Sequence, residues 1–190
     1  QYALVYSVLT SNATMGDVLS LFNSGHASGS NVSGSAAAPS VTTLNAGFLA
    51  MRKQTGLNTS AILNLEPRYL IVPVNYEATA MELLGSFARP EVGGSAAGNS
   101  NTLNIYGPGG QRRNLTLVAE PLLDSASSTT WYLAADPSQV DTVEITFLQG
   151  EESPVIDTEE DFDTDTYKYK IRQTMGAKAI DWRGLFRNSA

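Results

Sequence analysis

The chain has 190 residues, 42% of them hydrophobic and 16% charged, and its formal net charge at pH 7 is −7. This length supports one good core or two small ones, and the acidic balance excludes a general affinity for nucleic acid, which needs a basic surface. The absence of cysteine excludes disulfides, thiol nucleophiles and sulfur-ligated metals, and no apolar run approaches the roughly 20 residues of a membrane helix.

The first half of the chain predicts three helices and one strand. Apolar residues recur at helical spacing over Gln1–Asn12, and a second helix is expected over Thr42–Gly56, with Thr42 or Thr43 as its cap and a buried stripe of Leu44, Phe48 and Met51. The apolar run Pro67–Val74 predicts a strand, and Asn75–Gly85 a third helix. Between the first two helices, Ser24–Ser40 is rich in Gly and Ser and is expected to be a mobile loop.

The second half predicts short strands, which gives an α+β class. It opens with another glycine- and serine-rich loop, Arg89–Asn101, expected to be mobile, and the glycines of Gly107–Gly110 are expected to form a turn. The expected strands are Thr102–Tyr106, Leu115–Glu120, Trp131–Ala135, Val143–Gln149 and Thr166–Gln173. We expect the last two to share one sheet near the first helix.

Charge is concentrated near the C-terminus. The segment 151–165 holds 8 of the 19 acidic residues and no Lys or Arg, whereas 166–190 holds 6 of the 12 basic residues. Two adjacent blocks of opposite sign can pair within one chain or between chains. In the expected strand Thr166–Gln173, strict alternation predicts one packed face and one basic face; these are Tyr167, Tyr169 and Ile171, and Lys168, Lys170 and Arg172.

Three interpretations of this segment are open: a metal-binding loop, a β-strand that binds nucleic acid, and a surface that contacts another copy of the chain. Asp161, Asp163 and Asp165 match positions one, three and five of a calcium loop, but Thr166 stands where glycine makes the turn and Arg172 where a bidentate Glu belongs. A solvated acidic turn fits better. The nucleic-acid interpretation also fails. Alternation along the strand puts the tyrosines and the basic side chains on opposite faces, so one surface cannot both stack on nucleobases and bind phosphates.

No other pattern predicts catalysis or a cofactor. His26 is the single histidine, and no Gly-x-Ser-x-Gly elbow accompanies it, so a locally hydrogen-bonded loop histidine is expected rather than a hydrolase triad. The Gly107–Arg113 segment lacks the P-loop pattern, which leaves Arg112 and Arg113 on the rim of a glycine turn. We therefore predict no catalytic residue, no metal ligand and no cofactor.

Several segments carry a resemblance to a known family. Leu9–Ser28, with Gly16-Asp17 in inverted order, resembles the segment in which major capsid proteins of tailed phages, in the protease-fused and Mu-like groups, leave their long spine helix. The segment Leu57–Ser86 is similar to that family's Pro-Arg-Tyr-Leu strand and following helix, and Leu115–Pro137 and Val143–Asn188 are similar to its closing strands. The Trp-Arg-Gly ending is the most specific piece.

The resemblance implies the Hong Kong-type capsid fold. A peripheral domain of spine helix and long antiparallel strands would comprise residues 1–40 and 141–190, and a compact axial domain residues 41–140. The family's upstream arm, its extended loop and most of the spine helix have no counterpart in this sequence, so the chain resembles the C-terminal part of a longer protein. The implied function is structural: a head subunit that self-assembles into hexamers and pentamers of an icosahedral phage head enclosing double-stranded DNA.

The resemblance also implies partners and a location. The protein would be part of the virion, assembled in the host cytoplasm, with copies of itself, scaffold and the prohead protease as partners, only indirect contact with DNA, and no membrane. The alternative is a soluble α+β binding module that uses the basic strand face against an acidic partner.

The acidic run 157–165 contains no base and so cannot all be paired locally, and we expect it to meet the basic face of a neighbouring subunit. Trp182 fits either a core aromatic or an interface anchor, and Arg183 a partner for a carboxylate. The candidates for contact between subunits are Asp161, Asp163, Asp165, Lys168, Lys170, Arg172, Trp182 and Arg183.

Overall fold

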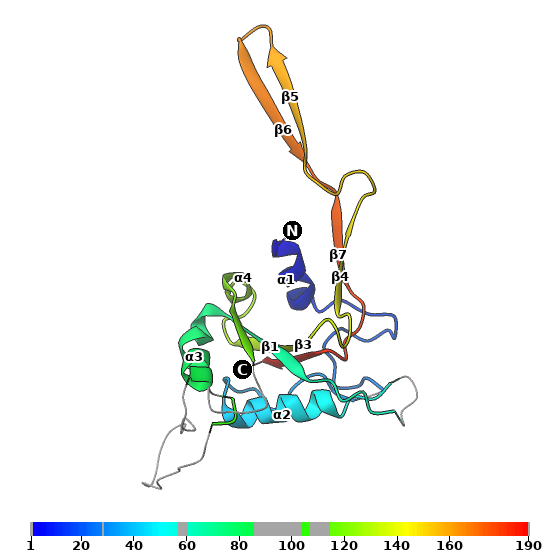
Figure 1. The fold of residues 1–190 in the computed structure, drawn as a ribbon, viewed down its shortest axis with the longest axis vertical. Helices are drawn as coiled ribbons and strands as arrows, with labels where there is room; N and C mark the ends of the chain where they lie inside the picture. The colour runs from blue at the N-terminus through cyan, green and yellow to red at the C-terminus, as the bar shows by residue number, and fades with distance from the viewer. Residues whose placement is uncertain (1, 28, 57–60, 86–103, 107–114, 190) are drawn as a thin grey trace.

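The computed structural model describes residues 2–27, 29–56, 61–85, 104–106 and 115–189. It is mixed α+β, with a body of packed helices and strands from which a two-stranded arm projects (Figure 1). The strands are β1 (Pro67–Val72), β2 (Thr116–Ala119), β3 (Thr130–Ala135), β4 (Val143–Phe147), β5 (Val155–Asp161), β6 (Thr166–Arg172), β7 (Met175–Ala179) and β8 (Leu185–Ser189). The helices are α1 (Tyr2–Ser11), α2 (Val41–Arg52), α3 (Glu77–Gly85), α4 (Pro121–Asp124) and the short 3₁₀ helix η1 (Val74–Tyr76).

A four-stranded sheet in the order β2-β1-β3-β8 forms the centre of the body. Strand β2 runs parallel to β1, whereas β3 is antiparallel to both β1 and β8. Strand β3 is buried along almost its whole length, as expected for a central apolar strand covered on both faces. The sequence predicted β1, β2 and β3, but not β8.

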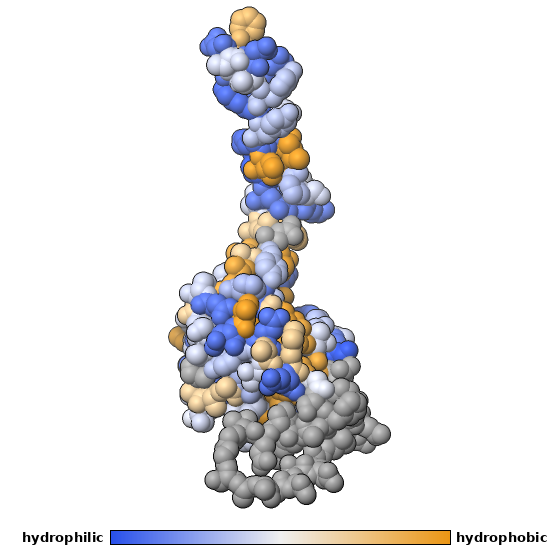
Figure 2. Space-filling model, turned by 90° about the vertical axis from the view of Figure 1, so that its left-hand side faces the viewer, coloured by the Kyte–Doolittle hydropathy of each residue, from blue (hydrophilic) through white to orange (hydrophobic). Residues whose placement is uncertain are grey.

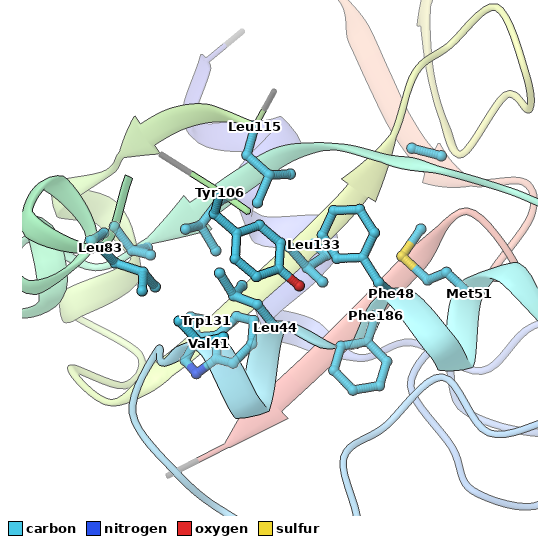
Figure 3. Close-up of a cluster of buried hydrophobic side chains, with 14 residues drawn as sticks. Val41, Leu44, Phe48, Met51, Leu83, Tyr106, Leu115, Trp131, Leu133 and Phe186 are labelled. Carbon is cyan, nitrogen blue, oxygen red and sulfur yellow. The ribbon is translucent and has the colours of Figure 1, made fainter. Parts of the chain in front are cut away.

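Helix α2 covers one face of this sheet with the predicted stripe of Leu44, Phe48 and Met51 (Figure 3). The helix is capped by Ser40 rather than by Thr42 or Thr43: Thr43 N–H donates to Ser40 Oγ, and Ser40 N–H donates to Thr43 Oγ1. This reciprocal capping box starts the helix one residue earlier than predicted. The other members of the core under α2 are Val41, Leu70, Val72, Ala80, Leu83, Tyr106, Leu115, Trp131, Leu133, Ala135 and Phe186.

A second core forms where α1 and the segment after it pack against α4, β3 and residues near the C-terminus. Its buried members are Val8, Leu9, Leu21, Phe22, Leu123, Tyr132, Trp182, Leu185. Described residues of the segment Ser24–Ser40, which is expected to be a mobile loop, form hydrogen bonds beside this core. Its Asn31 is fully buried and donates to the Leu21 carbonyl while accepting from Asn23 N–H. Polar side chains with specific backbone partners hold this segment, which composition alone could not reveal.

The C-terminal strands pair differently from the prediction. Strand β4 pairs with β7, and β6 pairs with β5 in a separate two-stranded ribbon, so the expectation that Thr166–Gln173 shares a sheet with Val143–Gln149 was wrong. Strands β5 and β7 were not recognised because β5 is largely acidic and β7 consists mainly of small residues, with one Met and one Lys. Helix α1 does contact β4 and β7, as expected for the first helix.

Some predictions lie partly or wholly outside the described residues. These are the loop Arg89–Asn101, the turn Gly107–Gly110 and the Arg112–Arg113 pair. Of the expected strand Thr102–Tyr106, residues 104–106 are described and form a turn, with Tyr106 buried in the core under α2.

Candidate interaction surface

The arm formed by β5 and β6 stands away from the body (Figure 1). The two strands are antiparallel, with Asp157 opposite Lys170 and Thr158 opposite Tyr169, and residues 162–165 connect them. Asp165 closes this connection in the left-handed region at φ 50°, a conformation that Asp adopts more readily than most residues. Side chains directly opposite each other in an antiparallel pair share one face, so the register assigns every residue of the arm to a face.

One face of the arm is charged and largely self-paired. Asp157 lies opposite Lys170 and Glu159 opposite Lys168, and Lys168 also forms an ion pair with Asp161. The hydrogen bond from Lys168 holds the pKa of Asp161 below its ordinary value. The acidic run therefore has basic neighbours in its own hairpin, which pair with part of it. That the remaining acids meet a neighbouring subunit stays a prediction.

The base of the arm is held by a similar contact. Arg172 Nη2 lies 3.1 Å from Glu151 Oε1. Even so, the segment 151–172 carries eight acidic residues against three basic ones, so five negative charges remain uncompensated within it. Exposed ion pairs of this kind contribute about 0–1 kcal/mol each, so they orient the strands more than they stabilise them.

The opposite face of the arm is mainly apolar and unpacked, with one acid, Glu160, opposite Tyr167. Ile156 lies opposite Ile171, and Thr158 opposite Tyr169, with Tyr167 further along the same face. Tyr169 and Ile171 are each 70% exposed, so the predicted packed face is exposed instead. The alternation was read correctly, but no element of the described chain lies over this face. Figure 2 shows hydrophobic residues among the hydrophilic ones of the arm.

The tip of the arm carries one more apolar side chain, Phe162, which is 99% exposed. Asp161, Asp163 and Asp165 surround it in the sequence. A lone two-stranded ribbon is at best marginally stable in water, and contiguous exposed apolar surface on a soluble protein marks an interaction site. The arm therefore has the properties of a surface that another molecule covers.

Trp182 and Arg183, by contrast, are engaged within their own chain. Trp182 is 6% exposed, and its ring stacks on His26 with the ring centroids 3.9 Å apart. Arg183 Nη1 lies 3.0 Å from Asp181 Oδ2, and its Nε donates to the Thr55 carbonyl at 3.1 Å. These contacts favour the core interpretation of Trp182 over the interface anchor.

His26 is buried and bonded locally, as predicted. Its Nδ1 lies 2.7 Å from Asp17 Oδ2 and its Nε2 lies 3.4 Å from the Leu21 carbonyl oxygen. Burial raises the pKa of Asp17, but the hydrogen bonds from His26 and from Leu19 N–H outweigh it, so the net pKa of that carboxyl is lowered. Because both ring nitrogens face these groups and one ring face is covered by Trp182, the histidine links the loop to the core.

The acidic tip does not form a metal cluster. Asp161 Oδ1 accepts from Asp163 N–H, a local turn contact. Within the described ranges no group of three or more His, Asp or Glu side chains is placed to hold a metal ion. None of the described helices is long and apolar enough to cross a membrane.

Sequence reasoning missed two parts of this surface: Phe162 and the strand β5. The alternation of Ile156 and Thr158 with acids was the available signal for β5, and a lone Phe within an acidic turn was the signal for an exposed anchor.

Comparison with known proteins gives one result. A family model described as phage capsid protein matches residues 1–188, nearly the whole chain. Comparisons with curated proteins and with solved structures find no match.

Proposed function

The chain belongs to the phage capsid protein family, which is a family of structural proteins of the virion, and from this membership we propose that it is a major head subunit with the Hong Kong-type fold. Its copies assemble into hexamers and pentamers of an icosahedral shell that encloses double-stranded DNA. In this proposal residues 1–40 and 141–190 belong to the peripheral domain and residues 41–140 to the axial domain. The protease-fused or Mu-like group, scaffold and prohead protease as partners, and assembly in the host cytoplasm belong to the same proposal.

The observation that carries the proposal is the family match over residues 1–188, and the arm supports it. A shell subunit contacts several neighbours, and the apolar face of Ile156, Tyr169 and Ile171 is surface that a neighbour would remove from water. Full burial of such a side chain contributes roughly 1.5–3 kcal/mol.

The charged residues then have a secondary role between subunits. Asp161, Lys168, Lys170 and Arg172 have acid or base neighbours on the same hairpin, so in the proposal they set the orientation of the contact, whereas the apolar face provides its free energy. The excess acid of the arm, at Asp163 and Asp165 above all, favours a basic region of the neighbour. Trp182 and Arg183 act by supporting the fold.

The test removes the apolar face without changing charge. The triple variant Ile156→Thr, Tyr169→Thr and Ile171→Thr keeps residues that favour strands and should leave the body folded while shifting sedimentation from large assemblies to monomers. The matched control, Leu49→Gln with Met81→Gln, removes two half-exposed apolar side chains from α2 and α3 and should assemble like the parent. Assembly of the triple variant equal to that of the parent would exclude the arm from the contact.

The alternative, a binding module that turns the basic strand face toward an acidic partner, finds less support. The basic side chains of β6 already lie opposite acids of β5, and the arm as a whole is acidic.

A further inference from the structure

An apolar hollow lies between α1, the segment that follows it and β7. Its volume is about 190 Å³. The buried side chains of Val8 and Leu21 contribute to its lining, with half-buried Met15, Ala177 and Ala179. Its remaining lining residues are Ser7, Ser11, Ala13, Thr14 and Lys178. The hollow is thus mainly apolar, and its lining also includes a few polar residues and the ammonium-bearing Lys178.

The arm presents a side chain of matching size and surroundings. A cavity of about 150 Å³ with apolar walls holds a benzene molecule, so the hollow can take the phenyl ring of Phe162. The acids next to Phe162 in the sequence would meet the exposed ammonium of Lys178, which has a single acid, Glu144, opposite it in the β4–β7 pair. Opposite charges at the two partners favour the correct encounter.

The hollow of the same copy is out of reach of the tip. Strand β5 has 7 residues, which span roughly 23 Å at about 3.3 Å per residue, and the arm extends away from α1 (Figure 1). The occupant must therefore come from another molecule.

We propose that Phe162 of one copy inserts into this hollow on a second copy, with Asp163 and Asp165 facing Lys178 of that copy. The inference rests on the proposed shell function and specifies one contact between neighbouring subunits. The two surfaces that meet are different, so the contact can repeat from head to tail and build the rings and extended arrays that a shell requires.

Because the chain has no cysteine, a disulfide can report the contact directly. The variant Thr164→Cys places a thiol at the tip and keeps Phe162, and Ala13→Cys places one beside the hollow. Mixing these two single variants under mild oxidation should give a mixed disulfide-linked dimer far above the amount seen with either variant alone, since a disulfide forms only when Cα atoms approach within about 7 Å. The matched control is Thr164→Cys mixed with Ala46→Cys, an exposed site on α2, which should cross-link only at background level.

Loss of the anchor provides a second, independent readout. Phe162→Ala should weaken association about 10- to 100-fold, which corresponds to about 1.4–2.8 kcal/mol, and Phe162→Leu should restore most of it. Lys178→Glu should weaken association as well, and Asp163→Lys with Asp165→Lys in the same chain should partly restore it.

The outcomes separate this inference from the proposed function. Assembly by the parent together with background cross-linking and unchanged assembly of Phe162→Ala would overturn the insertion and leave the shell function standing. A parent that stays monomeric at all concentrations, together with only background cross-linking of the Cys variants, would overturn both. Specific cross-linking to Ala13→Cys with weaker assembly of Phe162→Ala is the result the inference requires.

Discussion

Replacement of Trp182 by Ala distinguishes a core role from an interface role. The indole is 6% exposed, stacks on His26 at 3.9 Å, and has the Arg183 guanidinium 5.0 Å from its ring centroid. Truncation of a buried aromatic residue to Ala costs about 3–5 kcal/mol. For a chain of this size each kcal/mol lowers Tm by about 2–4 °C, so a decrease of about 6–20 °C is expected.

The assay is thermal unfolding followed by circular dichroism, together with sedimentation below the unfolding temperature. Tyr169→Ala is the matched control, because that side chain is 70% exposed on the arm; it should leave Tm almost unchanged and weaken assembly. If Trp182→Ala instead keeps the Tm of the parent and fails only to assemble, Trp182 is an interface anchor and the argument from its burial is wrong.

Three further substitutions test the fold. Gly184→Ala should lower the free energy of unfolding by about 1–3 kcal/mol, because a Cβ there would lie 2.5 Å from Val140 Cγ1 and 2.6 Å from Thr142 Cγ2; a denaturation midpoint equal to that of the parent would contradict this. Ser40→Ala removes the cap of α2 and should cost about 0.5–2 kcal/mol, measured by urea unfolding, whereas Ser40→Asp should be close to neutral. The pKa of Asp17 is lower in the folded state, so the stability contributed by its ionised carboxylate is present above the ordinary carboxyl pKa and is lost as pH falls through the folded pKa. Asp17→Asn should therefore flatten this part of the curve of stability against pH. An unaltered curve would exclude the Asp17–His26 contact as the source of this pH dependence.

The elements with a clear periodic signal could be predicted from the sequence. The stripe of Leu44, Phe48 and Met51 fixed α2, and compact apolar runs gave β1 and β3. The alternation in β6 also assigned its two faces correctly. Periodicity says which residues share a face, however, and not whether another element lies over that face, which is why Tyr169 was expected to be packed.

The pairing of the C-terminal strands depended on information that a single strand does not contain. Register follows from the partner, and β5 and β7 carry weak strand signals because one is acidic and the other consists mainly of small residues. The contacts of the loop around Asn31 were missed for a related reason: its hydrogen bonds to Leu21 and Asn23 cannot be predicted from composition.

Electron microscopy of the purified full-length protein tests the central claim most directly. A shell subunit should form closed particles, or rings with fivefold and sixfold symmetry. It should do so at concentrations where the triple variant, with Thr in place of Ile156, Tyr169 and Ile171, remains monomeric. A parent chain that stays monomeric over the whole range, with its thermal unfolding transition intact, would contradict the assignment of this protein as a self-assembling shell subunit.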